Sequence, residues 1–233
     1  MHTFLDAKTM AKALRQGLAD RDIELNHSDC LELVARQFGL NDWNTLAARI
    51  EAANRPAPPL PDGWFISHAN PAYYSIGLDP DERGSVCIAS VPGAAIPPDY
   101  TGVLMQSISA AHYIGEKLRL TAELRGEHAH LGTIWMRVDP SQGKSLRFDN
   151  MMRRNPDGVL RGTFGWTART IVLDIPENAA SIHYGYLLQG TGKLWARNFR
   201  LDIADPDAQT TGSTPFPPRP INLDFTTPAQ PHG

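Results

Sequence analysis

The sequence predicts a mainly β protein, an antiparallel β-sandwich preceded by a small domain of three helices. Two observations support this prediction. Apolar residues recur at helical spacing up to residue 52, whereas from Gly63 onward they alternate with polar residues in short runs separated by turn signals. Many short strands without long helices between them are typical of a sandwich and not of a parallel α/β sheet.

Length and composition are those of a globular protein. The chain has 233 residues, of which 42% are hydrophobic and 20% charged, and its formal net charge is −3. Because no basic patch stands out, we expect no nucleic-acid partner. No apolar run approaches the roughly 20 residues of a membrane span, and the first residues do not resemble a secretory signal. We therefore expect a cytoplasmic protein without a membrane segment.

Residues 1–52 are predicted to form the helical domain. Asp6 is the expected N-cap of the first helix. The second helix is expected to stop at Gly39, which fits the position after a helix C-cap. Asn41 is expected to cap the third helix. Matched apolar faces on three short helices can form a small core, and so short a domain is expected to dock on the rest of the chain.

Residues 53–62 contain four prolines and predict an extended linker. The sandwich is predicted over residues 63–204. Residues 205–233 are rich in proline, and a strand-like run at 221–225 is predicted to pack back onto the sheet. The predicted strands of the sandwich are 64–67, 73–78, 85–90, 103–108, 116–124, 132–138, 145–148, 167–174, 181–188 and 193–202.

A spaced pattern within residues 3–50 identifies a first family. The pattern is His27-Ser28-x-x-Leu31-Glu32-x-x-Ala35-x-x-x-Gly39-x-x-x-Trp43-x-x-Leu46. It resembles the small helical domain called glyoxalase-related, which accompanies a glyoxalase or bleomycin-resistance fold in other proteins. The chain shows no recognisable pair of βαβββ repeats with His and Glu metal ligands. The resemblance therefore implies no lyase activity.

Four pieces of the predicted sandwich, in order, resemble a second family. They are Leu104 to Ile108, Trp135 to Asp139, Phe148 to Met151, and the closing hairpin Gly190 to Phe199. Together they resemble the galactose-binding-like jelly rolls used by many carbohydrate-binding modules and found at the end of some bacterial regulators. The resemblance implies a jelly-roll topology for the sandwich. It also implies a domain that binds and does not catalyse.

The predicted ligand site combines aromatic and polar side chains. Alternation along a strand places Trp135 and Arg137 on one face, and the apolar residues between them on the other. Aromatic faces stack on sugar rings, and an arginine supplies a fork of donors. The full predicted set is Trp135, Arg137, Gln106, Asp149 and Asn150. For Trp135 the alternative is packing in the core of the sandwich.

The sequence gives little support for a metal site, a DNA-binding site or a catalytic site. His128 and His130 lack further ligands at a diagnostic spacing, so we expect no metal or cofactor. Read as a helix-turn-helix, residues 28–50 would offer only Arg49 as a base on the recognition helix. Catalytic signatures such as Gly-x-Ser-x-Gly or a phosphate loop are absent from the sequence.

Three functional hypotheses follow. The first is a non-catalytic, cytoplasmic regulatory protein whose sandwich binds a small polar or carbohydrate-like ligand. The second is a protein–protein adaptor in transcription or stress control that uses the same face. The third is an antibiotic-binding resistance protein, which is implied only by the proteins that the glyoxalase-related domain accompanies. A groove at Trp135 and Arg137 would favour the first hypothesis, and a flat apolar patch the second.

Overall fold

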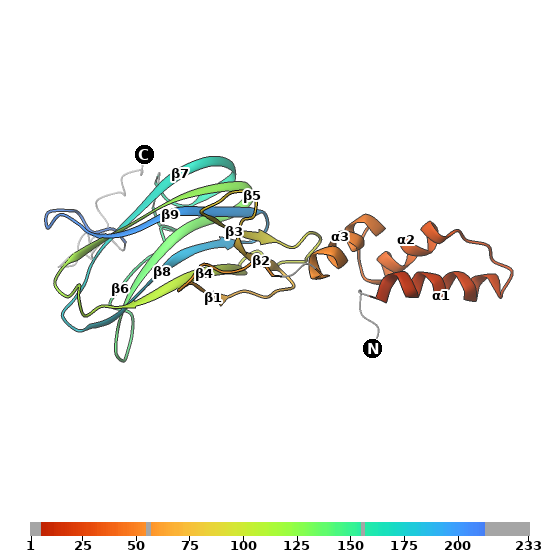
Figure 1. The fold of residues 1–233 in the computed structure, drawn as a ribbon, viewed down its shortest axis with the longest axis horizontal. Helices are drawn as coiled ribbons and strands as arrows, with labels where there is room; N and C mark the ends of the chain where they lie inside the picture. Colours follow the sequence, from red (N-terminus) through yellow and green to blue (C-terminus); the bar gives the residue numbers. More distant parts are fainter. Residues whose placement is uncertain (1–5, 55–56, 155–156, 213–233) are drawn as a thin grey trace, which may run out of the picture.

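The computed structural model describes residues 6–54, 57–154 and 157–212, and it confirms the predicted jelly-roll sandwich preceded by three helices. In Figure 1 the helices extend from one end of the sandwich, whose strands run along its length. The elements are α1 Ala7–Ala19, α2 His27–Gln37, α3 Trp43–Asn54, β1 Phe65–His68, β2 Tyr74–Leu78, β3 Ser85–Ser90, β4 Thr101–Ser109, β5 Lys117–Pro140, β6 Arg147–Asp149, β7 Leu160–Asp174, β8 Ala179–Gln189 and β9 Lys193–Ile203.

The helices end and begin at capping residues, one of which differs from the prediction. Gly39 has a φ of 74° and follows α2, as expected for a residue that stops a helix. The predicted cap of α3 at Asn41 is wrong. Asp42 fills that role, because its Oδ1 accepts a 2.7 Å hydrogen bond from the amide of Thr45. The helices share an apolar cluster of Ala7, Ala11, Cys30, Val34, Ala35 and Leu46.

Strand β5 divides the sandwich into two sheets because each of its halves has different neighbours. Its first half pairs with β7 and with β9, and β9 continues through β3 to β2. Its second half pairs with β6 and with β8, and β8 continues through β4 to β1. All these pairs are antiparallel. We call β1, β4, β8, β6 and the second half of β5 sheet I, and β2, β3, β9, β7 and the first half of β5 sheet II.

The main core lies between the two sheets. Tyr186 is its largest fully buried side chain, and its hydroxyl donates a 2.9 Å hydrogen bond to the carbonyl of Val86 across the layers. Burial of the tyrosine raises the pKa of its hydroxyl well above the ordinary value. Sheet I contributes Leu104, Ile134, Met136, Val138, Ile182, Tyr184 and Leu188, and sheet II contributes Ile76, Ile88, Leu118, Leu120, Leu124, Ile171, Leu173 and Leu194.

Two predicted strands, 116–124 and 132–138, are a single strand in the structure. The polar run around His128 and His130, which lies between these two predicted strands, is not a loop. Instead β5 continues through it, and His128 has a φ of 50° where the pairing with β7 shifts register. A residue in this left-handed conformation bends the strand, which allows β5 to pass from sheet II into sheet I.

Two further expectations concern the ends of the chain and the membrane. The extra strand predicted at 221–225 lies outside the described residues. Among the described helices, none has the length and apolar character needed to cross a membrane.

We expect Gly185→Ala to lower the free energy of unfolding by about 1–3 kcal/mol, as overpacking typically does. Gly185 lies in β8 between β4 and β5, and a Cβ there would overlap the backbone oxygen of Leu104. The matched control is Gly165→Ala, because a Cβ at Gly165 meets no atom within 4 Å. Urea unfolding of both variants measures the difference, and equal midpoints would contradict this close approach of β8 and β4.

Candidate functional site

The outer face of sheet I carries the two central residues of the predicted site. Trp135 and Arg137 point away from the core, because their neighbours Ile134, Met136 and Val138 belong to it. Across the β5–β8 pairing, Trp135 lies opposite Gly185 and Arg137 lies opposite His183. The predicted pairing of these two side chains on one face is thus present.

A polar network surrounds Arg137 on this face. The Nε of Arg137 donates a 2.8 Å hydrogen bond to Oδ2 of Asp139, and Nε2 of His183 lies 3.3 Å from the same oxygen. The Oγ of Ser107 lies 2.7 Å from Nδ1 of His183, and the Oγ of Ser181 lies 2.9 Å from its Nε2. Strands β4, β5 and β8 therefore converge on one imidazole that bridges two hydroxyls and a carboxylate.

The charge state of His183 follows from its surroundings. Burial lowers the pKa of its imidazole, the positive charge of Arg137 lowers it further, and Asp139 raises it. The net effect is a pKa below the ordinary value of 6.5. Because the folded state binds this proton less well than the unfolded state, His183 reduces stability as the pH falls below 6.5. Near neutral pH the network holds a neutral imidazole beside a paired arginine and carboxylate.

Trp135 is covered and does not form an open stacking surface. It is 7% exposed and packs with Val103, Met105, Leu131 and Leu187 in a second apolar cluster, on which Val159 lies. Within the part of the chain that the structure describes, its buried Nε1 has no hydrogen-bond partner, and the same holds for Oδ1 of Asp139. Buried polar atoms without partners are rare in proteins and call for an explanation. The exposed aromatic side chains on this face are Phe148, which is 47% exposed beside Arg137, and Phe65, which is 43% exposed on β1.

The structure does not bring the other predicted residues to this face. Gln106 lies opposite Tyr184 on the core-facing side, and its Nε2 donates a 3.3 Å hydrogen bond to Gly63. Asp149 lies opposite Met136, also on the core side, and pairs with Arg154.

Strand alternation explains the positions of Gln106 and Asp149, because each takes the side opposite to its outward-facing neighbours. Asn150 comes closer to the outer face, since its backbone carbonyl accepts a 3.0 Å hydrogen bond from the hydroxyl of Thr133. Thr133 is two residues before Trp135 on β5 and faces the same way.

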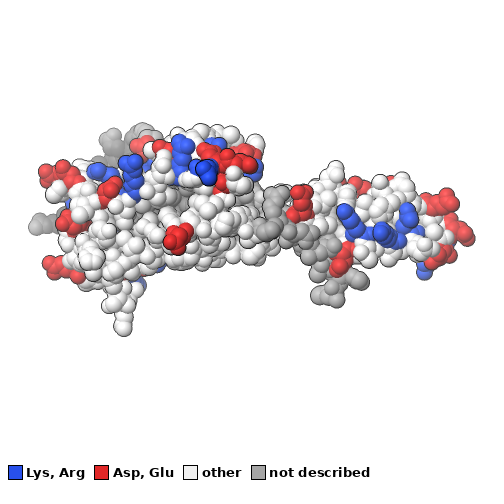
Figure 2. Space-filling model, in the orientation of Figure 1, with Lys and Arg blue, Asp and Glu red and all other residues white. Residues whose placement is uncertain are grey.

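The outer face of sheet II holds a second aromatic and charged group, which includes Trp195 and Trp166. The guanidinium of Arg125 lies 4.2 Å from the ring centroid of Trp195, and that of Arg197 lies 4.0 Å from the ring centroid of Trp166. The Nε1 of Trp195 donates a 2.5 Å hydrogen bond to Asp79. Figure 2 shows the charged residues gathered on this side of the sandwich. Trp166 does not stand out in the sequence, because it is the seventh residue of β7 and the strand predicted there starts only at residue 167.

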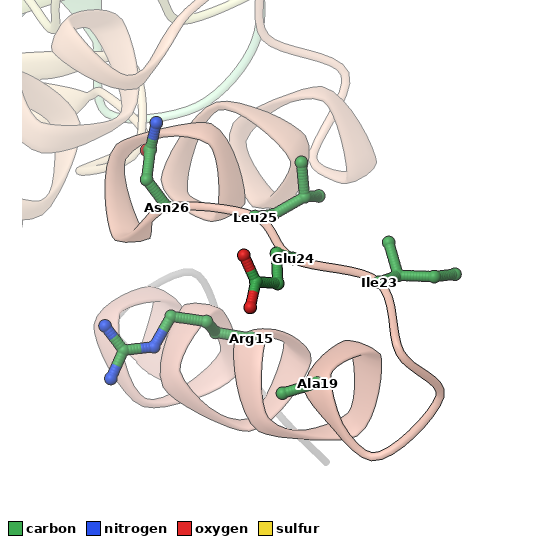
Figure 3. A pocket seen from close by; sticks show the side chains of 6 residues that line it. All are labelled: Arg15, Ala19, Ile23, Glu24, Leu25 and Asn26. Atoms are coloured by element: carbon green, nitrogen blue, oxygen red, sulfur yellow. The ribbon is translucent and has the colours of Figure 1, made fainter.

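Two hollows lie away from Trp135 and Arg137. Figure 3 shows the first, of about 450 Å³, between α1 and the loop before α2. Arg15 and Ala19 of α1 line it, together with the loop residues 23–26. The second, of about 300 Å³, lies on sheet II. Within the described residues, no three His, Cys, Asp or Glu side chains gather closely enough to hold a metal ion.

Comparison with known proteins supports the N-terminal resemblance. Residues 1–68 match the family described as "Glyoxalase superfamily protein", which confirms the similarity predicted for the helices. A Bacillus subtilis protein named "Uncharacterized HTH-type transcriptional regulator YbfP" is 30% identical over 170 residues, or 70% of this chain and 56% of that protein. The chain therefore spans about half the length of this relative.

Solved structures similar to the sandwich include carbohydrate-binding modules. A CBM4 structure covers 65% of this chain and 93% of its own, with 11% identity and a TM-score of 0.44. A xylan-binding domain from CBM 22 covers 61% of this chain and 88% of its own, also with 11% identity and a TM-score of 0.44.

We expect Asp139→Asn to lower the pKa of His183 further, because it removes the one negative charge that raises this pKa. The titration of the His183 ring signals by NMR measures the change. Asp174→Asn is the matched control, since Asp174 pairs with Arg147 and not with His183. An unchanged or higher pKa in Asp139→Asn would contradict the contact between Asp139 and His183.

Proposed function

We propose that the sandwich binds a small polar or carbohydrate-like ligand on the outer face of sheet I, and that this binding serves a regulatory role. The observation that supports the proposal is the network of Arg137, Asp139, His183 and Ser107 beside the exposed ring of Phe148. Such a mixture of fixed polar groups and an aromatic face is typical of sites that bind hydroxylated ligands.

The charge of the network favours an uncharged ligand. Arg137 and Asp139 neutralise each other, and His183 holds a lowered pKa, so the group has no net charge near neutral pH. A phosphate or carboxylate at Arg137 would be repelled by the carboxylate of Asp139, which lies 2.8 Å from Nε of Arg137. Hydroxyl groups can instead donate to the carboxylate and accept from the guanidinium without breaking this pair. A hydroxyl that reached the buried Nε1 of Trp135 or Oδ1 of Asp139 would satisfy an unpaired atom.

The regulatory part of the proposal rests on the Bacillus subtilis relative, whose name describes a transcriptional regulator. The 170 aligned residues exceed the helices and linker together, so the similarity extends into the sandwich. In such a regulator, ligand binding to the sandwich would control the activity of the other domains.

A thermal-shift screen of sugars, polyols, nucleotides and antibiotics tests the ligand and its class. A ligand that binds only the native state stabilises it by about 2.7 kcal/mol at a hundredfold excess over Kd. We expect uncharged hydroxylated compounds to raise the melting temperature, and Arg137→Ala to remove the shift. Arg153→Ala is the matched control, since Arg153 is exposed and makes no hydrogen bond or ion pair with Arg137, Asp139, His183 or Ser107. A shift that persists in Arg137→Ala would place the ligand elsewhere.

Trp135→Ala is expected to cost about 3–5 kcal/mol of stability, because truncation of a buried tryptophan leaves a cavity. The matched control is Phe148→Ala, for which we expect a small change because this ring is 47% exposed. Chemical unfolding of the two variants measures both effects. If Trp135→Ala unfolds like the wild type, the ring is not held by its cluster and is free to serve as a stacking surface.

The adaptor hypothesis has one observation in its favour. Phe65 and Phe148 are exposed on the outer face of sheet I, and the two hollows described above include neither Trp135 nor Arg137. Exposed aromatic side chains on one face also suit a protein partner. A flat thermal-shift response, together with a partner captured by the wild type and lost in Phe65→Ser with Phe148→Ser, would favour the adaptor. Raised drug resistance of a sensitive host that expresses the protein would favour the antibiotic-binding hypothesis.

A further inference from the structure

The outer face of sheet II contains a polar hollow that is lined by a carboxylate, an amide and an arginine. Its volume is about 300 Å³. Strand β5 supplies Thr121, Ala122 and Glu123, β7 supplies Ala168, and β9 supplies Asn198 and Arg200. Figure 2 shows that charged side chains gather over these strands. The small side chain of Ala168 stands between Trp166 and Thr170 on β7, which leaves room at the centre of the face.

A β-bulge in β9 directs Arg200 into this hollow. Glu123 lies opposite Arg197, and Thr121 lies opposite Arg200. Residues that are two apart on β5 therefore pair with residues that are three apart on β9. The extra residue is Asn198, whose φ of 53° is left-handed. Without the bulge, alternation from Arg197 would turn Arg200 towards the core. With it, Arg197 and Arg200 share the outer face, which is the usual effect of a bulge on side-chain direction.

Of the two arginines, only Arg197 is already paired. Its Nε donates a 2.7 Å hydrogen bond to Oε2 of Glu123, and its guanidinium covers the ring of Trp166. The hydrogen bond from Arg197 is the largest influence that lowers the pKa of Glu123, and the charge of Arg200 contributes as well. Among the described residues, Arg200 makes neither a hydrogen bond nor an ion pair, so its guanidinium is a cation without a counter-charge in direct contact.

We propose that this hollow binds a small hydroxylated carboxylate, such as a sugar acid, whose carboxylate pairs with Arg200. A guanidinium binds a carboxylate through two parallel hydrogen bonds. The hydroxyl of Thr121, the amide of Asn198 and the second oxygen of Glu123 would receive the hydroxyl groups. Glu123 stays ionised, so it accepts from hydroxyls and repels a second negative charge on the ligand. The site therefore differs from the uncharged network on sheet I in both position and ligand charge.

Titration with D-glucuronate, followed by backbone amide shifts in NMR spectra, tests the proposal. We expect shifts at Ala168 and Asn198, and none at His183 on the opposite sheet. D-glucose is the uncharged comparison and should leave Ala168 and Asn198 unchanged. Because charge-assisted hydrogen bonds contribute strongly, Arg200→Ala should weaken binding by about tenfold or more. Arg153→Ala should bind like the wild type.

A second variant separates ligand contact from damage to the fold. Asn198→Gly keeps the left-handed conformation, which glycine adopts freely, and removes the amide side chain with its 3.3 Å hydrogen bond to Oε2 of Glu123. We expect weaker glucuronate binding with an unchanged spectrum elsewhere. The proposal is overturned if glucuronate causes no shifts at millimolar concentration, if Arg200→Ala binds equally well, or if inorganic phosphate binds better than glucuronate. Shifts at His183 caused by glucose, with none at Ala168 or Asn198 caused by glucuronate, would support the proposed function and contradict this site.

Discussion

The structure depends on the passage of one strand between two sheets. Strand β5 is 24 residues long, and its first half pairs in sheet II while its second half pairs in sheet I. Two glycines flank the crossing point. A Cβ at Gly126 would overlap the ring of Phe164, and one at Gly132 would lie 2.5 Å from Cδ1 of Leu194. Core side chains from β7 and β9 therefore fill the inside of the bend, and only glycine leaves them this space.

The crossing of β5 also determines which polar side chains each outer face presents. Because β5 contributes to both sheets, its outward residues supply both faces: Glu123 and Arg125 on sheet II, and Trp135 and Arg137 on sheet I. Each face then takes its remaining groups from the partners of that half, His183 and Ser107 on sheet I, and Arg197 and Arg200 on sheet II. Ligand contact on either face would act on the same continuous backbone.

Local pattern predicted the architecture well and the site only in part. Alternation correctly placed Trp135 and Arg137 on one face. The same alternation, applied to Gln106 between Leu104 and Ile108, places Gln106 on the core side, where the structure also has it. The contact of Arg137 and Asp139 with His183 depends on the register between β5 and β8, which are joined through other strands. Register over such separations is set by packing of the whole core, and no local pattern encodes it.

Two Trp-x-Arg pairs in this chain show why pattern alone does not assign a role. On sheet II, Trp195 has its Nε1 bonded to Asp79, and Arg197 is held by Glu123, so every strong polar group of the pair is satisfied. On sheet I, Arg137 is held by Asp139, but the buried Nε1 of Trp135 has no partner among the described residues. An unsatisfied buried donor costs about 1–3 kcal/mol. The Trp-x-Arg pattern thus has hydrogen-bond partners for its tryptophan and its arginine on sheet II, whereas on sheet I the tryptophan donor lacks one among the described residues. The difference comes from which segments reach each face, since Asp79 follows β2 and bonds Trp195, while the apolar Val159 packs on the cluster that contains Trp135.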